Sequence, residues 1–342
     1  MRLDFSQEQL DLRGSVVRLF DTESSAELNR GLWATETGRN PALWQGLADI
    51  GITGLMVPEE FGGLGGDETD LCLVLEEVGR FCVPDAVLEA CLVAPVALAL
   101  GGSHDLRERW LPRIASGQAR ATIALPGTRY VPDVHLSEVV ILERAGELVL
   151  VERSELEFER VASMDPSRRL FEVRFGEDAG VPLELDGNGL AAIRSRQDFG
   201  SAAVLNGVSA AMIELTAGYV ATRRQFDRPI GSFQAVKHQL AQAESRNALA
   251  RQAARSASYY LSAGDPRAAD SAALARVCAI EAEFESNRVA LQLHGGIGFT
   301  WEYRLQDWLK RGKALEQAHG TRREALATAG RAGLADRTTN AV

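Results

Sequence analysis

Long amphipathic stretches dominate the second half of the chain and constrain its fold more than any other feature. Ala and Leu recur at helical spacing on one face of residues 193–222, 233–262, 267–294 and 301–326, while charged residues occupy the opposite face. Each such helix has to bury one apolar stripe, and an antiparallel four-helix bundle lets four long neighbours do so together. The pattern therefore predicts a C-terminal helical bundle over residues 187–342.

Residues 1–118 are also predicted to be helical. The segment Ser6-Gln7-Glu8-Gln9 has the pattern of a capping box, in which the serine caps a helix and the glutamine reaches back to it. Residues 71–100 are almost continuously apolar, as expected for helices that are buried. We therefore expect an N-terminal helical domain.

Between these two helical parts, residues 119–186 have the pattern of a small β domain. Short apolar runs at 139–142, 147–151 and 170–175 are separated by turn residues, as in strands joined by tight connections. A region of this size is within the range of a domain inserted between helical parts. The predicted fold class is α+β, with an N-terminal helical domain at 1–118, a middle β domain at 119–186 and a C-terminal bundle at 187–342.

The composition is that of a soluble globular protein and excludes some classes of partner. The chain has 342 residues, of which 46% are hydrophobic and 25% charged, so its length suggests two or three domains. Its net charge of -10 argues against nucleic acid or an anionic membrane as a general partner. No apolar run reaches membrane-spanning length and the first residues lack a signal-peptide pattern, so we expect a cytoplasmic protein.

The four cysteines give no indication of a metal site. Cys72, Cys82, Cys91 and Cys278 show no CxxC spacing and no histidine partner at ligand spacing. Three of them lie inside apolar helical patterns, which favours buried free thiols.

Two glycine-containing segments interrupt the helical pattern where long stretches end. Residues 223–234 read Arg-Arg-Gln-Phe-Asp-Arg-Pro-Ile-Gly-Ser-Phe-Gln, and residues 292–303 read Gln-Leu-His-Gly-Gly-Ile-Gly-Phe-Thr-Trp-Glu-Tyr. Glycine lets backbone amides approach another chain or a phosphate, because no Cβ stands in the way. Arg223 and Arg224 add forked donors that suit phosphate oxygens. One such break is commonly only a helix end, whereas two around one helical pair indicate a binding site.

These two segments resemble the signature of the acyl-CoA dehydrogenase family, whose members are flavoproteins that oxidise acyl-CoA thioesters. The order of helical, β and helical parts is also that of the family, and the resemblance covers nearly the whole chain. In this family the Arg-x-x-Phe and Gln-x-x-Gly-Gly segments hold the ADP part of FAD across a subunit interface. The resemblance implies these cofactor-binding residues: Arg223, Arg224, Gln225, Phe226, Gln234, Gln292, Gly295 and Gly296.

The same resemblance places the catalytic base, a glutamate in the family, at one of two positions. Counting from Gly295, the Glu-Gly-Thr segment of the family falls on His319-Gly320-Thr321, and counting back from Arg223, the other position falls on Gln197. Glutamine cannot take a proton, and Asp198 lies about 100° further around the helix, where we expect it to point elsewhere and to complement the helix dipole. Histidine has a suitable pKa for a base, but we interpret His319 as a partly exposed side chain at a helix end.

The middle domain also departs from the pattern of the family. Members that hold their own flavin carry Thr-Glu-Pro-x-x-Gly-Ser and Trp-x-Thr stretches beside the isoalloxazine ring. Here residues 121–129 keep only Pro126-Gly127 of the first stretch, and residues 119–186 contain no tryptophan. In this respect the chain resembles the shorter subunit of the actinobacterial heterotetrameric (α2β2) acyl-CoA dehydrogenases, which act on CoA thioesters of steroid side chains.

The resemblance implies a subunit that lacks its own catalytic residues and completes the FAD site of a full-length homologous partner. It also implies that the partner binds most of the acyl-CoA, that the setting is steroid degradation such as cholesterol catabolism, and that an electron-transfer flavoprotein or similar protein accepts the electrons. Two alternatives stay open at this point. One is a self-sufficient divergent oxidoreductase with His319 or Asp198 as its base, and the other is a structural homologue that binds neither flavin nor CoA.

Overall fold

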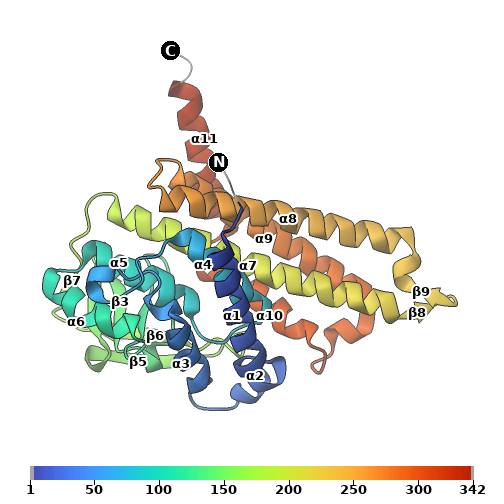
Figure 1. Ribbon diagram of the computed structural model, residues 1–342, viewed down its shortest axis with the longest axis horizontal. Coiled ribbons are helices and arrows are strands. Elements are labelled where there is room, and N and C mark those ends of the chain that lie inside the picture. The colour runs from blue at the N-terminus through green and yellow to red at the C-terminus, as the bar shows by residue number, and fades with distance from the viewer. Residues whose placement is uncertain (1–3, 340–342) are drawn as a thin grey trace.

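The structure, a computed structural model, describes residues 4–339, and its N-terminal part is helical (Figure 1). The helices of this part are α1 (Gln7–Glu23), α2 (Ala26–Leu32), α3 (Pro41–Ile50), η1 (Ile52–Gly54), η2 (Glu59–Phe61), α4 (Glu68–Arg80), the π-helical turn η3 (Glu89–Val93), α5 (Ala94–Gly101) and α6 (His104–Ala115). The predicted capping box is confirmed, because Ser6 Oγ accepts from Gln9 N at 3.2 Å and Gln9 Oε1 accepts from Ser6 N at 3.0 Å. The apolar stretch 71–100 forms α4, η3 and α5, and most of it is buried.

The middle part contains two small sheets. The first has the order β1-β3-β4-β7, with β1 parallel to β3 and the other pairs antiparallel. The second is antiparallel with the order β2-β6-β5. Their bounds are β1 (Ala121–Ile123), β2 (Val131–Pro132), β3 (Val139–Arg144), β4 (Glu147–Glu152), β5 (Leu156–Val161), β6 (Leu170–Phe175) and β7 (Val181–Pro182), with 3-10 turns η4 (Val134–Leu136) and η5 (Arg153–Glu155). The strands predicted at 139–142, 147–151 and 170–175 are confirmed.

The C-terminal part is a bundle whose long helices lie side by side in Figure 1. They are α7 (Gly189–Thr222), α8 (Gln234–Ser262) and α9 (Ala268–His294), followed by α10 (Leu305–Ala318) and α11 (Arg322–Thr339). Within the described residues, α7 is the single helix long and apolar enough to cross a membrane, contrary to the expectation that no apolar run reaches that length. Its most apolar window is 61% buried, as is usual for the core helix of a bundle.

The prediction of one helix over residues 301–326 is wrong, because the chain breaks between α10 and α11. Gly320 has a φ of 94°, a left-handed conformation that ends a helix. The guanidinium of Arg276 on α9 donates to the carbonyl oxygens of His319 and Gly320, the second at 2.5 Å. A cation from a neighbouring helix therefore satisfies the carbonyl groups that the break leaves unpaired.

The helical N-terminal part and the bundle are joined by direct contact between two helix backbones. A Cβ at Gly79 of α4 would lie 1.9 Å from the Val204 carbonyl oxygen, and a Cβ at Gly207 of α7 would lie 1.8 Å from the Glu76 carbonyl oxygen. Only glycine permits such an approach at either position. The two glycines therefore set the distance between α4 and α7.

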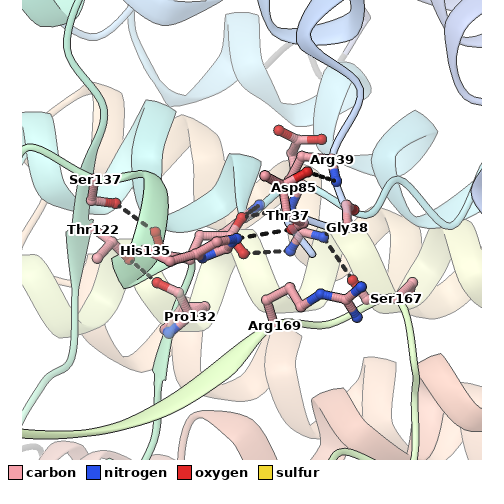
Figure 2. Close-up of polar contacts among 12 residues, drawn as sticks. Thr37, Gly38, Arg39, Asp85, Thr122, Pro132, His135, Ser137, Ser167 and Arg169 are labelled. Carbon is pink, nitrogen blue, oxygen red and sulfur yellow. Dashed lines mark hydrogen bonds and ion pairs between the residues drawn. The ribbon is translucent and has the colours of Figure 1, made fainter. Parts of the chain in front are cut away.

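Buried arginines join the middle part to the other two, and Figure 2 shows two of them, Arg39 and Arg169. Arg39 pairs with Asp133 and donates to the Ser167 carbonyl oxygen at 2.8 Å. Arg169 donates to the carbonyl oxygens of Leu32, Trp33 and Thr35, at and just after the end of α2. The bond to Thr35 is 2.9 Å long. On the bundle side, Arg311 of α10 binds Asp165 at 2.5 Å. These bonds fix how the sheets sit against the helices, and so they position the loops described below.

Candidate functional site

The first signature segment forms a hairpin that projects from the end of the bundle, at the right of Figure 1. Strand β8 (Arg224–Gln225) pairs with β9 (Arg228–Pro229), and a 3-10 turn, η6 (Ile230–Ser232), leads into α8. Phe226 and Asp227 both have positive φ, of 52° and 61°, as the two central residues of a type I′ turn do. The Phe226 side chain is 86% exposed, although a large aromatic group is normally buried.

The second signature segment lies at the same end of the bundle. It forms the 3-10 turn η7 (Gly295–Phe299) directly after α9. The Tyr219 ring, one turn before the hairpin, stacks on the His294 ring at a centroid distance of 4.4 Å. The structure therefore brings together two segments that are about seventy residues apart in the sequence, as the resemblance implies.

The residues predicted to bind the cofactor are all exposed, and few have partners within the chain. Exposed are Arg223, Arg224, Gln225, Phe226, Gln234, Gln292, Gly295 and Gly296. Among the described residues, the side chains of Arg223, Gln225, Gln234 and Gln292 make no hydrogen bond or ion pair, while Arg224 donates to the Asp227 carbonyl oxygen at 2.6 Å. This end of the bundle thus offers cationic and amide groups that are free to bind something outside the chain. We refer to these eight residues as the clamp.

The two glycines of the clamp differ in whether the conformation of the chain favours glycine at that position. Gly295 has a φ of 62°, which favours glycine for conformational reasons. Gly296 does not have a positive φ, and a Cβ added there would meet no atom within 4 Å. Nothing within the chain therefore explains a glycine at position 296.

The two positions that the resemblance assigns to the base line one cavity of about 350 Å³, which opens to the surface where the exposed residues Gly127 and Glu324 form part of its wall. Gln197 of α7 and His319 at the end of α10 lie in its wall, although they are more than a hundred residues apart. Pro126 and Gly127, which the resemblance connects with flavin binding, line the same cavity. The volume is in the range of small-molecule pockets. What this cavity can do chemically depends on the side chains in its wall.

His319 is buried and fully engaged, which corrects the interpretation of a partly exposed side chain. It is 6% exposed; its Nδ1 lies 2.6 Å from Ser201 Oγ and its Nε2 lies 3.1 Å from Glu89 Oε1. Burial lowers the pKa of His319, against the opposing effect of Glu89. Burial opposes ionisation of Glu89 as well, yet the hydrogen bond from His319 holds the pKa of Glu89 below its ordinary value.

The hydrogen-bond partners of the imidazole indicate where its proton lies. A neutral imidazole with its proton on Nε2 donates to the Glu89 carboxylate, and Nδ1 accepts from the Ser201 hydroxyl. Both ring nitrogens are occupied, so neither is available to take a proton from a substrate. Ser201 is completely buried, which also excludes it as a nucleophile for a ligand in the cavity.

Asp198 does not have the role that the sequence suggested. It lies more than two turns inside α7, not in the first turn, and its Oδ1 accepts from Arg276 Nη1 at 2.9 Å. Burial raises the pKa of Asp198, and the Arg276 cation opposes this effect. Asp198 lines the same cavity as Gln197, so the expectation that it points elsewhere is wrong. The Gln197 side chain is 2% exposed and makes no hydrogen bond within the described residues.

Sequence reasoning missed Glu89, Ser201 and Arg276, which hold this arrangement. Glu89 and Arg276 are charged residues inside apolar helical stretches. A charge in such a stretch was the only sequence signal that these residues have a special role. Ser201 lies in the Ala-rich face of α7 and gives no signal at all.

Comparison with known proteins identifies the family. Residues 6–118 match the acyl-CoA dehydrogenase N-terminal domain, and residues 187–334 match the acyl-CoA dehydrogenase C-terminal domain. The chain is 34% identical over 322 residues to acyl-CoA dehydrogenase IpdE2 of Mycolicibacterium smegmatis, covering 94% of this chain and 97% of that protein. The chain belongs to the acyl-CoA dehydrogenase family.

Solved structures agree with this assignment, and the solved relatives of this family include FAD-binding flavoproteins. The steroid acyl-CoA dehydrogenase Tcur3481-Tcur3483, in its G363A variant, has a TM-score of 0.87 and 25% identity, with 97% of this chain and 99% of that chain covered. The ChsE4-ChsE5 complex from Mycobacterium tuberculosis has a TM-score of 0.86 and 24% identity, with 97% and 98% covered. Together they confirm the predicted fold class of helical, small β and helical bundle parts.

Proposed function

We propose that this chain is a non-catalytic subunit of a hetero-oligomeric, FAD-dependent acyl-CoA dehydrogenase. The observation that carries the proposal is a contrast within one molecule. The clamp residues are exposed and mostly unpartnered, whereas the interior position of the base holds a glutamine and a fully engaged histidine. Such a chain contributes to a cofactor site on a partner and performs no proton abstraction itself.

The clamp residues fit the ADP part of FAD. Arg223 and Arg224 offer forked donors to phosphate oxygens, and the open space at Gly296 lets a group come close to the backbone. Phe226 presents an exposed aromatic face, and Gln225, Gln234 and Gln292 add amide donors and acceptors. Bound FAD supplies hydride acceptance from the substrate β carbon, while this chain binds and orients the nucleotide end.

The cavity does not fit the isoalloxazine ring of a flavin. A flat, largely apolar ring needs flat apolar walls, but Arg194, Asp198, Arg276, His319 and Glu324 line this cavity. No Trp, Tyr or Phe is among the described residues in its wall. This mismatch supports a subunit that holds no flavin ring in its own middle part.

The partner that we infer is a full-length homologous subunit, arranged with this chain as an α2β2 heterotetramer. That subunit supplies the carboxylate that removes the proton next to the thioester carbonyl, and it binds most of the acyl-CoA. The similarity to a steroid acyl-CoA dehydrogenase supports a bulky, steroid-derived acyl group, as in cholesterol catabolism, and the similarity to the ChsE4-ChsE5 complex supports an assembly of unlike subunits. We further propose a cytoplasmic setting and an electron-transfer flavoprotein or similar protein as the acceptor.

The ratio of flavin to protein tests the proposal. The chain is produced alone and together with full-length acyl-CoA dehydrogenase homologues from the same organism, and bound FAD is measured by its visible absorbance after purification. We expect no flavin in the chain alone and one FAD per pair of unlike chains in the complex. A yellow and active homo-oligomer formed by this chain alone overturns the proposal.

A further inference from the structure

His294 lies within the second signature segment, between Gln292 and Gly295, but it is not one of the clamp residues. It is the last residue of α9, directly before Gly295, and only 4% of it is exposed. Its ring stacks on Tyr219 with an interplanar angle of 24°, and the Tyr219 carbonyl accepts the backbone N–H of Arg223 at 2.8 Å. One ring contact therefore connects the base of the hairpin to the start of the glycine turn.

Hydrogen bonds hold the His294 ring in one orientation. The Ala290 carbonyl oxygen, 2.8 Å from Nδ1, can only accept, so Nδ1 carries the proton. Nε2 is then an acceptor and lies 3.1 Å from the Tyr303 hydroxyl, which donates to it. The Tyr303 ring also meets Tyr219 edge-on at 6.3 Å. Each of the three rings thus contacts the other two, and His294 is the one held by hydrogen bonds at both ring nitrogens.

The glycine turn packs directly on His294. A Cβ at Gly298 would lie 3.0 Å from the His294 Cβ, so the turn follows the histidine backbone closely. The carbonyl oxygen of Gly298 accepts from Gln306 Nε2 at 2.8 Å, which fixes the other side of the turn to α10. Exposed turns with few internal contacts are otherwise the mobile parts of a protein.

We infer that His294 is a positioning residue for nucleotide binding: through Tyr219 and Tyr303 it fixes the hairpin and the glycine turn relative to each other. This inference rests on the proposed function, because it assumes that both segments bind the FAD of the partner. His294 does not touch the nucleotide, since it is buried beneath the turn. Its effect is to preorganise the clamp, so that FAD binding does not have to order two independent segments.

The test measures FAD affinity and thermal stability of the assembled complex in the same set of variants. Apo-complex is titrated with FAD, and the dissociation constant is read from flavin fluorescence. His294→Leu keeps the volume but removes both hydrogen bonds, and Tyr219→Leu removes the ring stack; we expect each to weaken FAD binding about fivefold to tenfold. Tyr219→Phe keeps the stack and is the matched control, with unchanged affinity. Tyr303→Phe removes one hydroxyl only and provides a milder variant if His294→Leu fails to assemble.

The outcomes separate this inference from the proposed function. Arg223→Ala, which alters a clamp residue itself, is titrated in parallel. If Arg223→Ala weakens FAD binding while His294→Leu, Tyr219→Leu and Tyr303→Phe only lower the melting temperature, the positioning role is refuted and the proposed function stands. If Arg223→Ala also leaves FAD binding unchanged, the clamp does not bind FAD and the proposed function fails.

Discussion

Polar side chains at the outer end of the bundle and in the cavity wall differ in how many of their polar atoms are already paired within the chain. At the outer end, Arg223 and its neighbours in the clamp leave most of their donors and acceptors unpaired in solvent. In the cavity wall, His319 and Arg276 are fully buried and have most of their polar atoms bound to other parts of the same chain. Water hydrogen-bonds to the polar groups of the clamp, and a ligand can displace that water. The polar groups of the cavity wall are already bonded within the chain. The difference separates a site prepared for an outside partner from one that has become part of the scaffold.

The largest effect is expected from removing the cation of the cavity wall. Arg276→Met leaves the buried Asp198 carboxylate unpaired, which costs about 3 kcal/mol of unfolding free energy. Urea denaturation of the complex measures this loss of unfolding free energy. Because the pair acts as a unit, Arg276→Met with Asp198→Asn should lose less than the sum of the two single changes. If Arg276→Met instead removes flavin from the complex without destabilising it, the cavity is a cofactor site and the comparison above is wrong.

A somewhat smaller effect is expected at the outer end. Arg223→Ala combined with Phe226→Ala removes a forked cation and the exposed aromatic ring, and we expect FAD to bind about a hundredfold more weakly, equivalent to about 2.7 kcal/mol. Equilibrium dialysis of FAD against the complex measures the change. Arg174→Ala is the control and should leave FAD affinity unchanged, because this exposed arginine of β6 makes no side-chain hydrogen bond to any residue that the structure describes.

Acid should weaken the cavity network in a defined pH range. The pKa of His319 is lowered from 6.5, so the unfolded chain binds the proton more readily, and stability falls as the pH drops below about 6.5. The lowered pKa of Glu89 acts in the same direction at more acidic pH, below its ordinary value of 4.5. One proton contributes a slope of at most about 1.4 kcal/mol per pH unit.

Urea denaturation between pH 7 and 5 tests this slope. His294 and His135 also have lowered pKa values, so the wild-type slope contains their contributions. The informative quantity is therefore the difference from His319→Gln, which cannot take the proton and should show a shallower dependence. Identical slopes in the two proteins show that the His319 network does not titrate with unfolding.

The smallest effect is expected on turnover when His319 is replaced. With both ring nitrogens engaged by Ser201 and Glu89, His319→Gln should leave kcat/KM of the complex within about twofold of the wild type. Steady-state oxidation of an acyl-CoA with an artificial electron acceptor measures it. A fall of several orders of magnitude would revive the alternative in which this chain carries its own base.

The sequence predicts the regular parts of this fold well, because their signal is local. The apolar residues of α7, α8 and α9 recur with the helical period, and the predicted ends of these helices agree closely with the structure. The break after α10 is not local: Arg276, more than forty residues earlier, binds the carbonyl groups of His319 and Gly320 and stabilises it. For the same reason the Glu89–His319–Ser201 network could not be predicted, since it joins three segments that only the tertiary fold brings together.

The positions of the site residues were predictable only through the resemblance. Counting from the two signatures singled out Gln197 and His319, which line one cavity in the structure, yet it could not show that His319 is buried or that Asp198 is paired. Burial and pairing depend on neighbours from other helices. The exposure of the clamp, by contrast, follows from its own turns, because a two-residue hairpin and a glycine turn at a helix end have little chain around them.

The exposed aromatic groups at the clamp end have a consequence for how the cell has to make this protein. Phe226, Phe299 and Trp301 are 86%, 70% and 56% exposed on the isolated chain. Under the proposed function, a chain made without its partner would expose this apolar surface, which favours aggregation and proteolysis. Production together with the proposed partner subunit would keep the surface covered.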